Sequence, residues 1–346
     1  MSQAASENAS VVIVGATGHV GVEVLKLLQE SSILRADPVL LASSESQEDT
    51  LDFAGDKIDV KAAKDYQYQA KDIVILALPY DGAEIEFNRA KKAGAFIIDA
   101  TGVGRSAPDA PLAAPHLDEG LLKAAIKSRV VVLPEPMAMS LAAVLAPLDG
   151  SAKLQSAVVS TYQTVSRYGH GGIEELAKQS VGLLGGAGAG GFSGQIFPHQ
   201  VAFNVLPQVG RFEGVDTATE KHLAADTSAL LGRHIPIAAT CAIVPTFVGE
   251  ALSVHATFEK PIDAPKARDI ISNIEGVDVI DNPNQEAYST PYGSAEVNHT
   301  FVSRIREGAA PNTLQLWIVA DHLRVHVAGA LVRMAEKVAL EIQKLA

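Results

Sequence analysis

A glycine-rich segment near the start of the chain constrains the fold more than any other feature. It reads Gly15-Ala16-Thr17-Gly18-His19-Val20-Gly21 and lies between an apolar run, residues 11–14, and a stretch with apolar residues at helical spacing. Glycines here let the backbone turn tightly and approach a pyrophosphate, whose charge is met by the helix N-terminus. The G-x-x-G-x-x-G spacing is a variant of the usual fingerprint. It predicts a dinucleotide site at residues 15–20, with a tight packing turn that binds no ligand as the alternative.

Strand and helix signals alternate through the first half of the chain. This alternation is typical of a parallel, doubly wound sheet that binds ligands at the carboxyl ends of its strands. The expected strands are residues 11–14, 39–41, 73–78, 95–99 and 130–133, and an expected helix covers residues 83–93.

The second half contains longer segments rich in β-branched residues, which predict an α+β domain with a mixed or antiparallel sheet. The expected strands are residues 157–163, 237–244 and 251–258; the expected helices are residues 173–184, 217–231 and a closing helix with Asp321 as its cap. We therefore expect an α/β chain. Its Rossmann-like N-terminal domain would comprise residues 1–133 plus 322–346, and its C-terminal domain residues 134–321. The glycine-rich run at residues 185–194 is expected to be a mobile loop.

Composition narrows the class of partner and the compartment. The chain has 40 acidic and 28 basic residues, a formal net charge of −12, which argues against nucleic acid and anionic membranes because both attract basic surfaces. The single cysteine can form neither an internal disulfide nor a cysteine-based zinc site, which suggests a reducing compartment. No segment reads as a signal peptide or a membrane span, so we expect a cytoplasmic protein.

The end of the second expected strand bears on the choice of dinucleotide. The chain there continues through Ser43 and Glu45, at the place where an adenosine ribose would lie. A carboxylate satisfies a ribose 2′-hydroxyl and repels a 2′-phosphate, so Glu45 favours NAD over NADP. The alternative is that Glu45 is a solvated loop residue.

Several longer strings resemble one known family. These are GATGHVG, IIDATG, VSTYQTVS, FPHQVAFNVLPQVG and AATCAIVPTFVGEALSV, in an order and spacing that cover most of the chain. Together they resemble the aspartate-semialdehyde dehydrogenase family. The resemblance implies a dinucleotide-binding domain, a second domain that binds substrate and forms a homodimer, and reduction of aspartyl phosphate to its semialdehyde with a nicotinamide cofactor.

The resemblance also implies a cysteine nucleophile, a proton-transferring histidine and an arginine for the substrate carboxylate. At the matching positions this chain has Pro136, Glu250 and Ile243 in that order. Proline has no nucleophile, glutamate cannot stabilise a thiolate as an imidazolium can, and isoleucine cannot bind a carboxylate. Loss of a nucleophile with its base costs on the order of 10⁶ in turnover in a well-studied hydrolase. We therefore expect no useful rate for the family reaction.

Further positions of the family pattern are changed or kept. Two replacements change charge: Glu135 stands in place of an asparagine and Glu45 in place of an NADP-reading arginine. His222 replaces a phosphate-binding lysine, and Arg167 replaces a glycine of the turn near the nicotinamide. Gln163 and Arg105 match the active-site glutamine and a phosphate-binding arginine. Arg105, Gln163 and Arg167 are accordingly candidates for a new anion pocket, with an ordinary loop as the alternative for the segment around Arg167.

Four other residues with reactive or metal-binding side chains are weaker candidates for a functional role. Cys241 falls within an expected strand, where a buried packing role is favoured over a nucleophilic one. Ser140 has no base that the sequence reveals. His322 and His326 are four residues apart and could share a metal, but hydrogen bonding on a helix surface or between domains is the favoured interpretation, and we expect no metal site.

These observations favour a divergent, Usg-type paralogue that lacks the catalytic cysteine and histidine. We expect it to bind a small anionic ligand and NAD, to form a homodimer and to act in binding or regulation. An active NAD-dependent oxidoreductase with altered catalytic residues, and a structural partner in a mixed dimer with a catalytic homologue, are the two alternatives.

Overall fold

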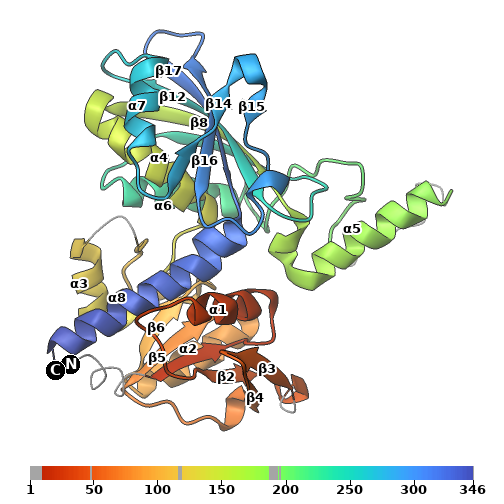
Figure 1. Ribbon diagram of the computed structural model, residues 1–346, viewed down its shortest axis with the longest axis vertical. Coiled ribbons are helices and arrows are strands. Elements are labelled where there is room, and N and C mark those ends of the chain that lie inside the picture. Colours follow the sequence, from red (N-terminus) through yellow and green to blue (C-terminus); the bar gives the residue numbers. More distant parts are fainter. Residues whose placement is uncertain (1–9, 47–48, 116–118, 187–193, 195, 346) are drawn as a thin grey trace. The chain divides into compact units, whose positions relative to one another are not determined.

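The computed structural model describes residues 10–46, 49–115, 119–186, 194 and 196–345. The chain divides into two compact units, Met1–Pro134 with Val327–Ala346 and Glu135–His326, here called unit 1 and unit 2 (Figure 1). Most of the glycine-rich run expected to be a mobile loop lies outside the described residues.

Unit 1 is built on a largely parallel sheet, as predicted. The strands lie in the order β3-β4-β2-β1-β5-β6-β7, and β3 alone among the described strands of this sheet is antiparallel to its neighbour. Their bounds are β1 Ser10–Val14, β2 Val39–Ala42, β3 Thr50–Phe53, β4 Asp56–Ala62, β5 Asp72–Leu76, β6 Phe96–Asp99 and β7 Val130–Val132. The central strands are buried on both faces, which is why they read as continuous apolar runs. The β3–β4 hairpin was not predicted, because exposed charged residues break its apolar pattern.

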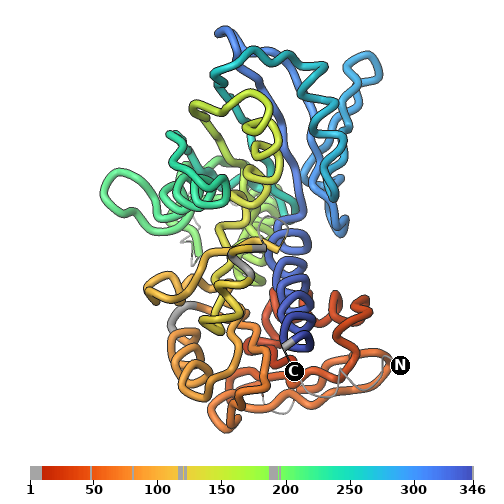
Figure 2. Tube along the Cα trace, turned by 90° about the vertical axis from the view of Figure 1, so that its left-hand side faces the viewer, coloured from red at the N-terminus to blue at the C-terminus, as the bar shows by residue number. Residues whose placement is uncertain are grey.

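Helices from distant parts of the sequence complete unit 1. They are α1 (His19–Gln29), α2 (Tyr80–Lys92), α3 (Glu119–Ser128) and the C-terminal α8 (Gly329–Leu345). The last of these, α8, contacts α1, α3, β5 and β6, so that the C-terminal helix runs alongside elements formed near the N-terminus (Figure 2). Its apolar stripe, which repeats at helical spacing, is therefore buried within unit 1.

Unit 2 is built on a mixed sheet, also as predicted. The strand order is β11-β8-β12-β17-β16-β13, with parallel pairs at both edges and antiparallel pairs between them. The bounds are β8 Leu154–Gln163, β11 Ile237–Ile243, β12 Glu250–Phe258, β13 Val277–Val279, β16 Thr300–Glu307 and β17 Thr313–Ala320. Two short hairpins accompany this sheet, one of β9 (Phe212–Glu213) with β10 (Asp216–Thr217) and one of β14 (Asp281–Asn282) with β15 (Ala287–Tyr288).

A largely buried and mostly apolar helix, α4 (Pro136–Ala152), forms the centre of unit 2. It packs on β8, β12 and β17 and contacts α6 (Ala218–Leu230) and α7 (Ala264–Ser272). Because α4 is buried on nearly every side, it has no polar face and no amphipathic pattern. The remaining helix, α5 (Gly169–Leu184), follows the 3₁₀ turn η4 (Val165–Tyr168), and the π-helical turn η7 (His322–Ala328) precedes α8.

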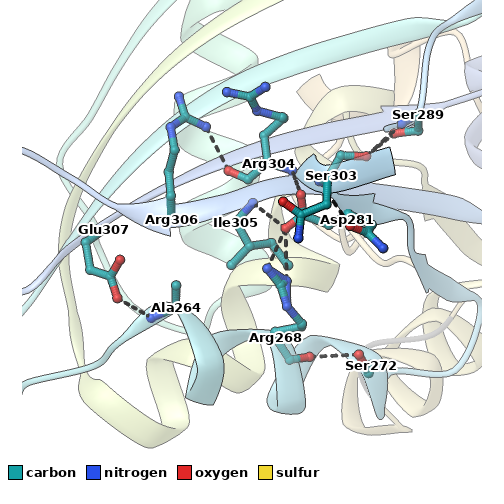
Figure 3. A network of polar contacts seen from close by, with 12 residues as sticks. Ala264, Arg268, Ser272, Asp281, Ser289, Ser303, Arg304, Ile305, Arg306 and Glu307 are labelled. Atoms are coloured by element: carbon teal, nitrogen blue, oxygen red, sulfur yellow. Dashed lines mark hydrogen bonds and ion pairs between the residues drawn. The ribbon is translucent and has the colours of Figure 1, made fainter. Parts of the chain in front are cut away.

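A buried carboxylate stabilises a bulge in unit 2 (Figure 3). The register of β16 shifts between Ser303 and Arg306, and Arg304 has φ +55°. Asp281 accepts the backbone N–H groups of Arg304 and Ile305 at 2.9 and 3.0 Å. It also accepts hydrogen bonds from both terminal nitrogens of Arg268, at 2.9 and 2.7 Å. Each oxygen of this carboxylate therefore has a donor.

Within the described ranges, none of the helices is both long and apolar enough to cross a membrane.

Candidate functional site

The glycine loop of unit 1 is a tight turn that packs closely against its own backbone. Gly15 has φ +91°, and a Cβ at this position would lie 2.4 Å from the Ala77 carbonyl oxygen. A Cβ at Gly21 would lie 2.1 Å from the Gly15 carbonyl oxygen. Gly18 is the N-cap of α1 and has no side chain to occupy the helix N-terminus, where Ala16, Thr17, His19 and Val20 also lie. Only glycines permit these close backbone contacts, and the predicted dinucleotide site at residues 15–20 coincides with this turn and the N-terminus of α1.

The segment after β2 lies at the carboxyl end of the parallel sheet. It begins with Ser43 and continues as a short 3₁₀ turn, Ser44–Ser46, in which Glu45 is exposed. The Glu45 carboxylate is thus accessible at the end of β2, where the fold class places an adenosine ribose.

Arg105 lies in a tightly ordered loop after β6. Asp99, buried at the end of β6, accepts the backbone N–H groups of Thr101 and Gly104, each at 2.7 Å. A Cβ at Gly104 would lie 2.7 Å from the Val132 side chain, so the loop is closely packed against β7. Arg105 therefore has a fixed place in unit 1, whereas Gln163 and Arg167 belong to unit 2.

Three adjacent strands of unit 2 end in a row of side chains that the sequence analysis singled out. Ile243 ends β11 and pairs with Gln163, which ends β8. On the other side of β8, Ala251 pairs with Tyr162, so Glu250 continues that register opposite Gln163. Cross-strand neighbours have Cβ atoms about 5 Å apart and share a face of the sheet. Sequence positions 163, 243 and 250 are thus brought together, on the face covered by α4.

Glu250 is the most unusual member of this row. It is fully buried, and neither carboxyl oxygen has a hydrogen-bond partner of normal geometry among the described residues. Its position is fixed by Gly249, whose φ is +73° and whose Cβ would lie 2.1 Å from the Pro291 carbonyl oxygen. Burial raises the pKa of Glu250 to about 8, although the nearby Arg167 guanidinium offsets part of the rise. Burial thus favours the protonated form of this group.

Gln163 has one satisfied and one unsatisfied group. Its Nε2 donates to the Thr161 hydroxyl at 3.0 Å. Its Oε1 is buried and has no hydrogen-bond partner in the described part of the chain. The same is true of the Thr246 hydroxyl, in the segment whose backbone continues the pairing of β11 with β8.

Arg167 connects two of the acidic residues. Its Nη2 donates to Glu135 Oε1 at 2.6 Å, and its Nη1 lies 3.9 Å from Glu250 Oε1. Burial alone would lower the pKa of this guanidinium, but the carboxylates of Glu135 and Glu250 raise it above its usual range. The predicted anion-binding Arg167 is thus already paired with acid. A Cβ at Gly172 would lie 2.3 Å from the Val165 carbonyl oxygen, which packs the start of α5 against the turn that carries Arg167.

Asp226 was missed by the sequence analysis. It is buried on α6, and its Oδ2 accepts the backbone N–H of Glu135 at 2.7 Å, immediately before α4 begins at Pro136. The available signal was its helical spacing from Leu223, a buried apolar residue on the same face. Asp226 therefore fixes the backbone on which Glu135 is presented to Arg167.

Cys241 is inaccessible, as its position in a strand suggested. It is fully buried in β11, and its backbone N–H donates to Glu220 at 3.0 Å. Burial raises the pKa of its thiol to about 12. The sequence contains no other cysteine, so the only thiol of the chain is one whose ionisation is disfavoured by burial.

Two expectations about serine and histidine are wrong in part. Ser140 does have a basic neighbour, because its hydroxyl lies 2.6 Å from His326 Nε2. His322 and His326 do not lie on a helix surface: both are buried, and His322 Nδ1 lies 3.8 Å from Glu250. The sequence could not reveal this pairing because 186 positions separate Ser140 from His326. Over the described residues, no group of three or more His, Cys, Asp or Glu side chains is arranged to hold a metal.

Comparison with known proteins identifies the family. The family model described as "Semialdehyde dehydrogenase, NAD binding domain" matches residues 10–125, and "Semialdehyde dehydrogenase, dimerisation domain" matches residues 145–325. Aspartate-semialdehyde dehydrogenases from Aquifex aeolicus and Campylobacter jejuni are 33% and 32% identical, over 94% and 96% of this chain and 96% and 98% of those proteins. A solved structure, aspartate semialdehyde dehydrogenase II from Vibrio cholerae complexed with ASA, has a TM-score of 0.91 at 28% identity, covering 97% of this chain and 99% of that one. This chain belongs to the aspartate-semialdehyde dehydrogenase family.

Proposed function

We propose that this chain is a divergent paralogue that binds a dinucleotide and a small ligand but does not carry out the cysteine-dependent reaction of its family. The state of Cys241 carries the proposal. A thiol with a pKa of about 12 is ionised in fewer than about one molecule in 10⁴ at neutral pH, and this one is buried in a strand. A thioester route needs an accessible thiolate, and the sequence offers no second cysteine.

The replacements at the expected catalytic positions support the same proposal. Pro136 is the first residue of α4, Glu250 is a buried acid, and Ile243 is a buried aliphatic residue. None of them supplies a thiolate, and none can hold the carboxylate of a substrate as an arginine would. The second acid, Glu135, is paired with Arg167 at 2.6 Å, so this guanidinium is not available as a cation for a doubly anionic acyl phosphate.

The decisive experiment is the phosphate-dependent oxidation of aspartate semialdehyde, followed by the absorbance of the reduced nicotinamide. We expect a rate on the order of 10⁶ below that of an active homologue assayed in parallel, because nucleophile and base are both replaced. Robust turnover with NAD or NADP would overturn the proposal.

For the cofactor we propose NAD in preference to NADP. Glu45 is exposed at the end of β2 and would accept a ribose hydroxyl but repel a 2′-phosphate. In calorimetric titrations, NAD should bind at least tenfold more tightly than NADP. Gly15→Ala should abolish binding, since its Cβ would collide with Ala77. Gly55→Ala is the matched control, because Gly55 has a similar φ of +94° and open space around its Cβ. Tighter binding of NADP would contradict the role given to Glu45.

One observation favours a second candidate function, that of an NAD-dependent oxidoreductase acting on an aldehyde or oxo group. Reduction of a carbonyl requires a hydride, which a bound nicotinamide supplies, and a proton donor. Burial favours the protonated form of Glu250, whose pKa is raised to about 8. A screen of carbonyl compounds with NADH tests this candidate. Activity that Glu250→Gln abolishes without loss of NAD binding would support it, whereas no turnover of any compound would exclude it.

We propose that the chain forms a homodimer through the sheet of unit 2. The face of this sheet opposite α4 carries Val158, which is 56% exposed, and a partly exposed pair formed by Tyr162 and Trp317 with ring centroids 5.4 Å apart. An apolar patch on a sheet face is suited to association with a second copy. Light scattering after gel filtration should give the mass of a dimer. Val158→Lys should shift it toward the monomer, whereas Val215→Lys, at a 92% exposed turn position, should not.

A further inference from the structure

The bulge of β16 holds Arg304 in a strained backbone conformation. Its φ of +55° lies in the left-handed region, which glycine adopts readily and which costs energy for a residue with a side chain. The strain persists because Asp281 accepts the backbone N–H groups of Arg304 and Ile305, and Arg268 fixes Asp281 in turn. Strained residues that the surrounding structure holds in this way are concentrated at functional sites. The conformation therefore raises the question of what the Arg304 side chain does.

The guanidinium group of Arg304 has no structural role that the described residues reveal. The residue is exposed, and only its backbone has partners: the N–H bonds Asp281, and the carbonyl oxygen accepts a hydrogen bond from Arg306 Nη1 at 2.8 Å. A guanidinium carries N–H donors in a fixed fork and stays protonated at all ordinary pH values. Arg304 thus keeps its donors and its charge for a group outside this part of the chain.

The same bulge turns Arg306 to the same side of the strand. The register shift adds a residue to β16 between Ser303 and Arg306, so that Ile305 enters the core while both arginines are exposed. Figure 3 shows the two arginine side chains extending to one side of β16, away from Asp281. The bond from Arg306 Nη1 to the Arg304 carbonyl oxygen keeps this guanidinium close to the bulge. The bulge therefore presents two cations together.

Neighbouring strands add further donors on this face of the sheet and no acid. Gln315 on β17 pairs with Arg306, and its Oε1 accepts Arg306 Nη2 at 2.6 Å, which leaves its amide nitrogen as a donor. His255 on β12 pairs with Gln315 and is exposed. Cross-strand neighbours lie on one face with Cβ atoms about 5 Å apart. Among the described residues of β8, β12, β17 and β16, this face carries no Asp or Glu, although the whole chain has a net charge of −12.

We propose that Arg304 and Arg306, together with Gln315 and His255, bind the phosphate group of a small ligand at the β16 bulge. Two guanidinium groups match the two negative charges of a phosphate dianion, and each can donate a pair of parallel hydrogen bonds to its oxygens. The ligand is either free phosphate or a phosphate monoester, since both present the same oxygens. No covalent bond is made or broken: the phosphate exchanges hydrogen bonds to water for hydrogen bonds to these side chains.

The site is separate from those considered above. Arg105 and the glycine loop belong to unit 1, whereas all four side chains of the phosphate site belong to unit 2. Val158, in the patch proposed for the homodimer, lies on β8, three strands from β16 and thus about 14 Å away at the usual strand spacing. The inference therefore goes beyond the proposed function and does not depend on it.

The test is calorimetric titration of the full chain with inorganic phosphate and with phenyl phosphate at constant ionic strength. The wild type should bind at least one of them saturably, and the tighter of the two identifies the free anion or the monoester as the ligand. Arg304→Gly should weaken this binding by about tenfold or more, because it removes one of the two guanidinium groups. Glycine adopts a φ of +55° readily, so this variant should keep the bulge and should not melt at a lower temperature. Equal binding by wild type and Arg304→Gly, or no saturable binding of either phosphate, would overturn the inference.

Further variants separate a phosphate site from general electrostatic attraction. Arg211→Gly removes the same charge from an 83% exposed side chain of unit 2 and should leave binding unchanged. Arg304→Lys keeps the charge but loses the fork and should weaken binding severalfold. Arg306→Gln should weaken it about as much as Arg304→Gly, with thermal unfolding to establish that the variant is folded. A loss of affinity in Arg211→Gly equal to that in Arg304→Gly would contradict the inference.

A last variant distinguishes this site from the anion contact expected in unit 1. Arg105→Gln should retain phosphate binding that depends on Arg304. If Arg105→Gln abolishes all phosphate binding, the site at the bulge is overturned and the contact in unit 1 accounts for the anion. Titration of NAD and the assay with aspartate semialdehyde test the proposed function separately, and neither result changes what is expected at the bulge.

Discussion

Asp281 and Glu250 are both buried carboxylates of unit 2, and their surroundings are opposite. The Asp281 side chain is 2% exposed and accepts two backbone N–H groups and both terminal nitrogens of Arg268 (Figure 3). Glu250 is fully buried, and its nearest cation, Arg167, lies 3.9 Å away and is bound more closely to another acid. The first carboxylate has every donor that it needs for structure. The second is held in place by the fold with no side-chain donor within hydrogen-bond distance, only more distant neighbours at 3.8 and 3.9 Å.

The largest expected effect comes from removing Asp281, the carboxylate whose hydrogen bonds are all made. Asp281→Ala removes the acceptor of two backbone N–H groups at the β16 bulge and leaves Arg268 without its partner, so unit 2 should lose about 3 kcal/mol of unfolding free energy. Asp281→Asn keeps one acceptor oxygen and should lose less. Urea-induced unfolding measures both. As a control, Asp278→Ala removes an exposed acid that bonds His299 and should change little. An unchanged Asp281→Ala protein would show that the bulge does not depend on this side chain.

The next effect concerns Glu250 and the dependence of the unfolding free energy on pH. The pKa of Glu250 is raised from 4.5 to about 8, so the folded state binds a proton that the unfolded state has lost. The part of the stability that depends on Glu250 is therefore fully present below about pH 4.5 and is lost as the pH rises through about 8. Glu250→Gln should remove this slope and be the more stable protein by on the order of 3 kcal/mol above pH 8. Urea unfolding at a series of pH values tests this, and a wild-type stability that does not fall across this range would contradict it.

The same two carboxylates show what the sequence could predict. Periodicity was sufficient for the class of both sheets and for β8, β11 and β12 of unit 2, because these strands are either buried on both faces or alternate in polarity. It did not predict β13, β16 or β17, which complete the unit 2 sheet. It also ended one expected strand at Gln163 and began another at residue 251, whereas the structure begins β12 at Glu250. It could not show that these two residues share a face, since that depends on the register between β8 and β12.

Pairs formed by distant side chains were beyond sequence reasoning. Arg167 was expected to bind an anion, and the position of Glu135 beside it depends on Asp226, 91 residues away along the chain. The bulge at Arg304 and the pairing of Ser140 with His326 depend equally on tertiary packing. Local propensity carries no information on such contacts, which is why the fold was predicted better than the site.

The smallest expected effect concerns the buried hydrogen bond between Ser140 and His326. Each member of this pair has one close partner, fewer than Asp281 and more than Glu250. Ser140 and His326 satisfy each other at 2.6 Å, with the Thr300 hydroxyl a more distant neighbour of the same histidine nitrogen at 3.4 Å. Ser140→Ala should cost about 1–2 kcal/mol in urea unfolding, because a buried ring nitrogen loses its closest partner. Ser180→Ala is the matched control: that hydroxyl bonds only the Leu176 carbonyl of its own helix, which the helix backbone can satisfy, so the expected change is under about 0.5 kcal/mol. Equal losses in the two variants would mean that the pairing with His326 adds nothing to stability. Ser140 would then resemble Glu250, in that both are buried polar groups that do not stabilise the fold.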